Sequence, residues 1–228
     1  QGRCWRQALG RPVVLAAVTR EGEEQALLSA WGAVSWPSAR PLLLIVPRHP
    51  QRFDEVAGLV TAAGLSLWRR STLPAVPAGE QQGASWSSPS AQALAADVWL
   101  GDSLGEMALY YGVADAALLG GSFAPLGGQN LIEALACGCP MVVGPHTFNF
   151  AEATEGAIAA GAAERVQDVA EAVARLKHWL APAQRGALAQ RAASGQAFAA
   201  AHRGAAQRMA QAVADVWADA GVRGRSAP

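Results

Sequence analysis

The sequence predicts an α/β fold, in which a Rossmann-like parallel sheet of about six strands carries helices on both faces. Two observations predict it. Short apolar segments without polar alternation recur along the first two-thirds of the chain, as is typical of strands buried on both faces. Stretches with helical character separate these segments, and parallel strands need such crossover connections.

Each expected strand is an apolar run bounded by Gly, Pro or polar residues. The strands are residues 12–18, 42–46, 65–68, 97–100, 116–119 and 141–143. The helices between and after them are residues 21–31, 51–63, 104–111, 130–136 and 150–160. Acidic residues open the first helix, where they suit the helix dipole. Gly64 suits the position just past the end of the second, and Ser103 with Glu106 matches a capping box for the third.

Two stretches depart from this alternation. Residues 71–90 are rich in Pro and Ser and predict a long surface loop. The Ala-rich stretch 168–220 predicts amphipathic packing helices, with breaks at Pro182 and Gly186. We therefore expect residues 1–166 to form one Rossmann-like domain and residues 167–228 to add packing helices to the same domain.

Composition excludes several classes of protein. The chain has 228 residues, of which 51% are hydrophobic, so it is not a disordered chain. Its 18 basic and 18 acidic residues give a net charge of zero, which argues against nucleic acid as the main partner. No apolar run approaches the roughly 20 residues that cross a bilayer, so we expect the chain as given to be soluble. It does not begin with Met, and we expect it to be part of a longer protein.

The three cysteines, Cys4, Cys137 and Cys139, predict a reducing compartment, because their number is odd and they form no disulfide pattern. Cys137 and Cys139 lack a second Cys or His pair at zinc spacing. We therefore expect small core thiols and no metal site.

In doubly wound sheets, ligands bind at the loops that follow the strands. After the second strand, two prolines hold Arg48 and His49 in extended backbone. The forked donors of an arginine suit phosphate or carboxylate, although an exposed turn explains the same residues.

The loop after the fifth strand carries two glycine pairs, at 120–121 and 127–128, and continues into a helix. Its backbone amides can approach a phosphate. Asn130 and Glu133 are three residues apart and share a helix face, where a carboxylate can accept both hydroxyls of a ribose. Asn as a cap and Glu as a dipole partner are the alternative. The loop matches neither the dinucleotide nor the P-loop pattern. The loop after the sixth strand adds His146, although a single His is more often structural.

Together these loops resemble one family. The segments that carry the resemblance are Thr-Arg-Glu-Gly-Glu-Glu at 19–24, Pro-Arg-His-Pro at 47–50, Gly-Asp-Ser-Leu-Gly-Glu-Met at 101–107, Gly-Gly-Ser at 120–122, Gly-Gly-x-Asn-x-x-Glu at 127–133 and Gly-Pro-His-Thr-Phe-Asn-Phe at 144–150. Over about residues 11–166 the chain resembles the carboxy-terminal half of the 3-deoxy-D-manno-octulosonic acid (Kdo) transferases, the lipid A glycosyltransferases of Gram-negative bacteria.

The resemblance implies a GT-B architecture, in which the carboxy-terminal domain binds the donor, CMP-Kdo. The residues it assigns to the CMP site are Pro47, Arg48, Gly105, Glu106, Met107, Asn130 and Glu133. From their positions we add Gly121 and Ser122 for phosphate contact, and His146, Thr147 and Asn149 as cleft residues. Many relatives have His-Asn-Pro where this chain has Gln129-Asn130-Leu131, so a role for a His at 129 does not carry over.

The resemblance also implies an inverting reaction without metal, and no cofactor beyond the donor. The catalytic base is expected in an amino-terminal domain that is missing here, with the membrane anchor and the site for the acceptor, the lipid A precursor lipid IVA. The full-length protein is then expected at the cytoplasmic face of the inner membrane. We expect no catalytic residue in this chain, which should bind CMP but not transfer Kdo.

Two other functions remain open at this point. One is a GT-B enzyme that uses a UDP- or GDP-sugar, since its fold and glycine-rich loop would look similar. The other is a nucleotide-binding module without chemistry of its own.

Overall fold

The computed structural model describes residues 2–36, 39–73 and 89–202. The strands are β1 (Val13–Thr19), β2 (Leu42–Pro47), β3 (Leu67–Arg69), β4 (Val98–Leu100), β5 (Ala116–Leu119), β6 (Met141–Val143) and β7 (Ala163–Arg165). The α-helices are α1 (Gly2–Leu9), α2 (Glu23–Ala33), α3 (Phe53–Ala62), α4 (Ala91–Ala95), α5 (Met107–Val113), α6 (Ile132–Ala136), α7 (Ala151–Ala159), α8 (Val169–Trp179) and α9 (Arg185–His202). Short 3-10 turns are Pro50–Arg52, Arg70–Thr72, Phe148–Phe150 and Pro182–Gln184.

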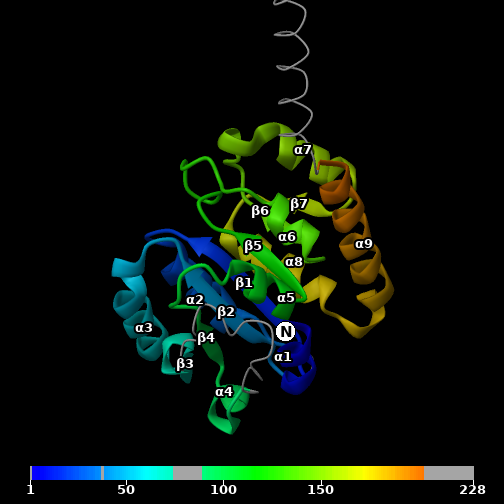
Figure 1. The fold of residues 1–228 in the computed structure, drawn as a ribbon. Coiled ribbons are helices and arrows are strands. Elements are labelled where there is room, and N and C mark those ends of the chain that lie inside the picture. The colour runs from blue at the N-terminus through cyan, green and yellow to red at the C-terminus, as the bar shows by residue number, and fades with distance from the viewer. Residues whose placement is uncertain (1, 37–38, 74–88, 203–228) are drawn as a thin grey trace, which may run out of the picture.

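The strands form one sheet of seven, in the order β3-β4-β2-β1-β5-β6-β7, and every neighbouring pair is parallel (Figure 1). The predicted parallel α/β sheet is confirmed, and six strands lie at or within two residues of their predicted bounds. The count of about six was one short, because β7 at Ala163–Arg165 is a three-residue edge strand with polar residues and gives no apolar run.

Helices cover both faces of the sheet (Figure 1). One core contains side chains of α1, α4, α5, α6, α7 and α9, and the other contains those of α2, α3 and α8. The central strands serve both cores alternately: Leu15 of β1 points into the first, and Val14 and Ala16 point into the second. This two-sided burial explains why the strands read as unbroken apolar runs.

Several local predictions were wrong. Helix α5 begins at Met107, not at 104, and Glu106 occupies its N-cap position without a side-chain cap bond, so the predicted capping box does not form. Gly186 lies inside α9 and breaks nothing, whereas Pro182 does begin a separate turn. Helix α1 was not predicted at all. Gly64, at φ 72°, does follow the end of α3 as expected.

Part of the predicted 71–90 loop, residues 74–88, lies outside the described residues, as does the predicted helical tail beyond residue 202. Within the described ranges, no helix combines the length and apolar character needed to cross a membrane.

Candidate functional site

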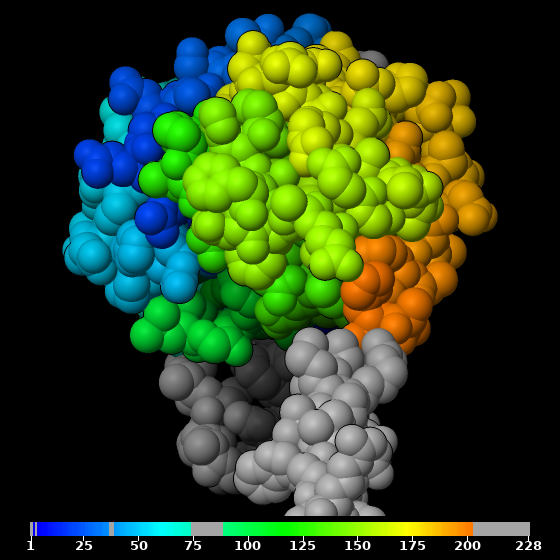
Figure 2. All heavy atoms as spheres, turned by 90° about the horizontal axis from the view of Figure 1, so that it is seen from above, coloured from blue at the N-terminus to red at the C-terminus, as the bar shows by residue number. Residues whose placement is uncertain are grey.

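The candidate site lies at the edge of the sheet where the parallel strands end. Strand β1 lies between β2 and β5, so the chain leaves β1 toward one half of the sheet and builds the other half later. Ligands of open α/β sheets bind at such a switch point. Segments from distant parts of the chain meet on one face of the molecule, where blue, cyan, green and yellow-green atoms adjoin (Figure 2).

The buried carboxylate of Glu23 joins the loops that follow β1 and β5. It accepts the backbone N–H of Arg20 at 2.9 Å, of Gly121 at 2.8 and 2.9 Å, and of Phe123 at 3.3 Å. Burial raises the pKa of Glu23 above its usual value, while these N–H groups act against that rise. The amide of Gly121, predicted to contact phosphate, is thus already bonded within the protein.

Ser122 is also engaged within the protein. Its side chain is fully buried, its hydroxyl donates to the carbonyl of Leu119, and it accepts the N–H of Gly144 at 2.8 Å. The carbonyl of Ser122 accepts the N–H of His146 at 3.0 Å. These bonds join the loops after β5 and β6, so the phosphate contact predicted for Ser122 would need its hydroxyl to change partners.

The same two loops meet again farther along. The backbone N–H of Asn149 donates to the carbonyl of Gly127 at 3.1 Å. The side-chain amide of Asn149 donates to the carbonyl of Leu126 at 3.0 Å. Thr147 is buried and accepts from Arg165 at 2.7 Å. Asn149 and Thr147, both predicted as cleft residues, therefore hold this corner of the site together.

The end of β1 is strained where it meets β5. Val18 has φ 55°, a left-handed conformation that is rare for a β-branched residue. The register to β2 shifts between Ala17 and Thr19, as in a β-bulge. A side chain at Gly120 would overlap with the backbone of Val18 and Thr19. The close approach of the two strand ends thus requires glycine there.

The Pro47–Arg48 pair lies beside this bulge. The N–H of Arg48 donates to the carbonyl of Thr19 at 2.9 Å, while the Arg48 side chain is exposed. The fully buried carboxylate of Glu24 accepts from the hydroxyl of Thr19 at 2.7 Å and from the guanidinium of Arg52 at 2.6 Å. These internal bonds hold the end of β1 against the turn that carries Arg48.

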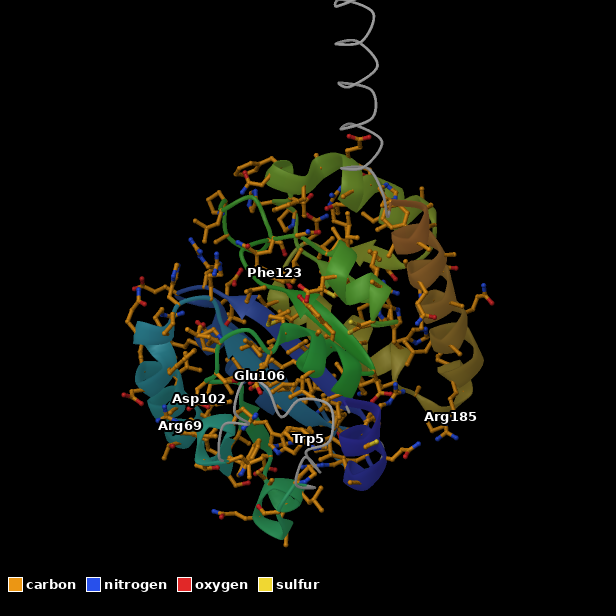
Figure 3. The ribbon with its side chains drawn as sticks, viewed as in Figure 1. Trp5, Arg69, Asp102, Glu106, Phe123 and Arg185 are labelled. Atoms are coloured by element: carbon orange, nitrogen blue, oxygen red, sulfur yellow. The ribbon has the colours of Figure 1, made fainter. Side chains whose placement is uncertain are left out.

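Gly105 and Glu106 lead into α5, which begins at Met107. The carboxylate of Glu106 accepts from Arg70 at 2.7 Å and from the hydroxyl of Ser103. Arg70 is itself buried, and its guanidinium lies 5.9 Å from the ring centre of Trp5 in α1. Figure 3 shows Glu106 and Trp5 in this region. Arg70 and Ser103 therefore fix the Glu106 side chain, while Gly105, at φ 76°, is exposed.

Next to Glu106, Asp102 holds the turn that follows β3. It accepts from Arg69 at 2.6 Å and from the N–H and hydroxyl of Ser71 at 2.7 and 2.6 Å (Figure 3). Burial alone would raise the pKa of Asp102, but the bonds from Ser71 and Arg69 outweigh it and lower the pKa.

Glu133 lies in the first turn of α6, whereas Asn130 precedes the helix, which begins at Ile132, so the expected shared helix face does not form. The side chain of Asn130 accepts the N–H of Ile132 at 2.9 Å, which is the local turn that Asn favours. Glu133 is exposed and forms no hydrogen bond or ion pair with the residues the structure describes. Its carboxylate is thus open to a ligand, as is the half-buried ring of His146.

Among the described residues, no group of three or more His, Cys, Asp or Glu side chains could hold a metal ion. Cys137 is partly buried and Cys139 fully buried, and burial raises the pKa of both thiols. They are core thiols, as predicted.

The sequence prediction missed four residues of this edge: Arg20, His49, Arg70 and Trp5. Arg20 donates to the ring Nε2 of His49 at 3.1 Å. In the sequence, His49 follows Arg48 between two prolines, and Arg20 lies in a motif dominated by glutamates, so neither pattern identifies a ligand contact. The doublet Arg69-Arg70 after a strand was the available signal for Arg70, whereas nothing local marks Trp5.

A cavity of about 590 Å³ opens at the opposite edge of the sheet. Arg6, Arg11, Asp115, Trp179 and Arg185 are among its lining residues, and none of the predicted donor-binding residues is. Arg6 pairs with Asp115, and Arg11 donates to backbone carbonyls, so these two cations serve the fold. This cavity is therefore separate from the predicted donor-binding residues.

Comparison with known proteins supports the predicted relationship. The chain is 49% identical over 218 residues to a 3-deoxy-D-manno-octulosonic acid transferase of Bordetella pertussis, a match that covers 94% of this chain and 47% of the relative. The chain thus spans about half the length of this curated relative. No protein-family model matches the sequence.

Solved structures are also similar to the chain. The C-terminal CMP-Kdo binding domain of WaaA from Acinetobacter baumannii superposes with a TM-score of 0.69 at 28% identity, covering 86% of this chain and 97% of that domain. WaaG, a glycosyltransferase involved in lipopolysaccharide biosynthesis, shares the fold alone, with a TM-score of 0.53 at 14% identity over 87% of this chain and 46% of WaaG. The chain is therefore a homologue of the 3-deoxy-D-manno-octulosonic acid transferases, and its fold is similar to that of the C-terminal CMP-Kdo binding domain of WaaA.

Proposed function

We propose that this chain is the donor-binding half of a glycosyltransferase that moves Kdo from CMP-Kdo to a lipid A precursor, lipid IVA, in lipopolysaccharide core biosynthesis. The observation that carries the proposal is the similarity to the CMP-Kdo binding domain of Acinetobacter baumannii WaaA over 97% of that domain. The open side chains at the switch-point edge support it, because they offer what a nucleotide needs.

Arg48 and Glu133 are the two side chains we assign to CMP directly. Arg48 is exposed at the end of β2 and forms no ion pair with the described residues, so its guanidinium is open to the phosphate. Glu133 offers free carboxylate oxygens to the hydroxyls of the ribose. Pro47 and Asn130 fix the backbone from which these two side chains extend.

The segment Gly105–Met107 contributes its backbone in this proposal. The carboxylate of Glu106 is bound to Arg70 and Ser103, so it positions the segment rather than reaching the nucleotide. Gly121, Ser122, Thr147 and Asn149 act similarly, since their polar groups hold the loops after β5 and β6 together. His146 remains a candidate ligand contact through its ring.

We place the catalytic base outside this chain. Glu23 and Glu24 lie near the switch point, but the first accepts several backbone N–H groups and the second is bound to Thr19 and Arg52. The Oε2 of Glu24 has no partner among the described residues, but Glu24 is fully buried, so neither carboxylate is placed to take a proton from an acceptor hydroxyl. An amino-terminal domain with the acceptor site and membrane anchor, an inverting reaction without metal, and a place at the cytoplasmic face of the inner membrane follow from the family resemblance.

Calorimetric titration of the 228-residue chain with CMP, UDP and GDP tests the nucleotide. We expect CMP to bind most tightly, and Arg48→Gln to weaken it about tenfold, because a charge-assisted hydrogen bond is lost. A preference for UDP or GDP would contradict the proposal in favour of another GT-B donor.

Activity is tested by joining the natural upstream sequence to this chain. The longer protein should transfer Kdo from CMP-Kdo to lipid IVA, and the chain alone should not. A longer protein that binds CMP without transfer would indicate a nucleotide-binding module instead.

A further inference from the structure

The arginines near the carboxyl ends of the strands fall into two groups. Arg52, Arg69, Arg70 and Arg165 each form an ion pair with a carboxylate 2.6–2.9 Å away. Arg20 and Arg48 form none with the residues the structure describes. Arg20 and Arg48 follow the adjacent strands β1 and β2, so the switch point carries two neighbouring cations without an internal anion.

Arg20 is held in place on three sides. Its backbone N–H donates to Glu23, the same carboxylate that binds Gly121 and Phe123. Its aliphatic part crosses over Gly121, where the Cγ lies 3.5 Å from the position a Cβ would take. Its Nη1 donates to His49, 3.1 Å away. The remaining guanidinium N–H groups are left for a ligand at the glycine-rich loop.

The glycine-rich loop itself offers little to a second anion. The amides of Gly121 and Phe123 are bound to Glu23, and the hydroxyl of Ser122 is bound to backbone groups. An anion placed over this loop must therefore be met by side chains, and Arg20 is the charged side chain that crosses it.

The inference rests on the proposed function. The sugar of the proposed donor is an ulosonic acid, so its anomeric carbon carries both a carboxylate and the phosphate ester. Two anions on one carbon match two neighbouring arginines. We propose that Arg20, oriented by His49, binds the carboxylate of the sugar, while Arg48 binds the phosphate. Arg20 thereby selects a sugar acid over a neutral sugar.

The test compares CMP with CMP-Kdo by calorimetry on the 228-residue chain. Arg20→Gln should raise the Kd for CMP-Kdo about tenfold and change the Kd for CMP less than about twofold. His49→Leu should lower the same selectivity by a smaller factor, because Arg20 keeps its charge but loses its orientation. Retained CMP binding reports that each variant is folded.

Arg185→Gln is the matched control. It also removes one positive charge, but from an exposed residue at the opposite edge, away from the glycine-rich loop marked by Phe123 (Figure 3). Neither Kd should change. Equal losses for CMP and CMP-Kdo in Arg20→Gln, or no loss for either, would overturn the assignment of Arg20 alone. A wild-type chain that binds neither ligand would overturn the proposed function, and the assignment with it.

Discussion

At the scale of single residues, the carboxylate of Glu23 joins the loop after β1 to the loop after β5 through hydrogen bonds. A glutamine in its place keeps one acceptor oxygen for Gly121 but turns a donor toward either the N–H of Arg20 or that of Phe123. We expect Glu23→Gln to reduce the free energy of unfolding by about 1–3 kcal/mol, because a buried N–H loses its acceptor. Urea denaturation measures this loss.

The neighbouring Glu21 provides the control for Glu23. It is exposed and forms no ion pair with the described residues, so Glu21→Gln removes the same charge with little expected effect on unfolding. Equal stability of the two variants would mean that the Glu23 bonds contribute nothing net.

Asp102 gives a prediction about acid. Its folded-state pKa is lowered by its bonds to Ser71 and Arg69, so the unfolded chain takes up its proton first. Its stabilising effect is therefore complete above the unfolded pKa of about 3.9 and is lost as the pH falls below that value toward the folded pKa. Asp102→Asn should reduce the free energy of unfolding by about 1–3 kcal/mol at pH 7. On acidification, this variant should lose less stability than the wild type does.

Asp54 serves as the comparison for Asp102, because it pairs with the same Arg69 but its side chain is 89% exposed. Asp54→Asn should cost less than about 1 kcal/mol at pH 7. Urea unfolding of both variants at pH 7 and pH 3 measures how much stability each loses on acidification. Equal losses in the two variants would refute the prediction.

At the scale of elements, the loops after β5 and β6 approach so closely that one of them must lack a side chain. A Cβ at Gly144 would overlap with the carbonyl of Ser122 and lie 2.9 Å from the ring of Phe123. We expect Gly144→Ala to destabilise the chain by about 1–3 kcal/mol, since backbone must move to make room. Thermal unfolding measures the loss.

A second glycine gives the opposite expectation. Gly58 lies inside α3 with open space at its Cβ position, so Gly58→Ala should stabilise the chain by about 0.5–1 kcal/mol. If Gly144→Ala and Gly58→Ala shifted the melting temperature in the same direction, the close contact between the loops after β5 and β6 would not explain the effect of Gly144→Ala.

Elements with a strong local signal were the ones the sequence predicted well. β5 and β6 were placed to the residue because each is an apolar run between polar or glycine-rich turns. β7 and α1 were missed, because the first is too short and polar and the second depends on tertiary contacts with α5 and with Trp68 and Trp99. The start of α5 was misplaced because Ser103 bonds side chains and not the helix backbone.

At the scale of the whole molecule, one sheet divides two cores that share its strands. Trp5, Trp68 and Trp99 belong to one core, and Trp31 and Trp179 to the other. Because each strand alternates between them, we expect neither core to persist without the other. Variants that retain the tryptophans of only one core, with the rest replaced by Phe, should unfold in urea with the same m-value.

In those variants, the fluorescence transition should also coincide with the loss of helical circular dichroism. Two separate transitions in either variant would instead indicate that the helices on one face unfold independently of the sheet.

The site was predictable to the extent that its loops carry motifs. Position after a strand correctly brought Arg48, Gly121, Ser122 and His146 to one edge of the sheet. What each polar group bonds to was not predictable, because the partners come from distant segments: Glu23 lies about a hundred residues from Gly121, and Arg70 bonds Glu106 across the sheet edge. A motif therefore identifies candidate residues, but their hydrogen-bond partners become known only from the fold.

The bonds that Glu23 makes to the loop after β5 also bear on how fast a ligand can enter. Because that loop is already ordered by Glu23 on one side and by the loop after β6 on the other, its conformational entropy is lost during folding and not on association. A nucleotide arriving from solution then meets a surface that needs no rearrangement. Its association in stopped-flow experiments should follow a single exponential whose rate rises linearly with ligand concentration and does not level off.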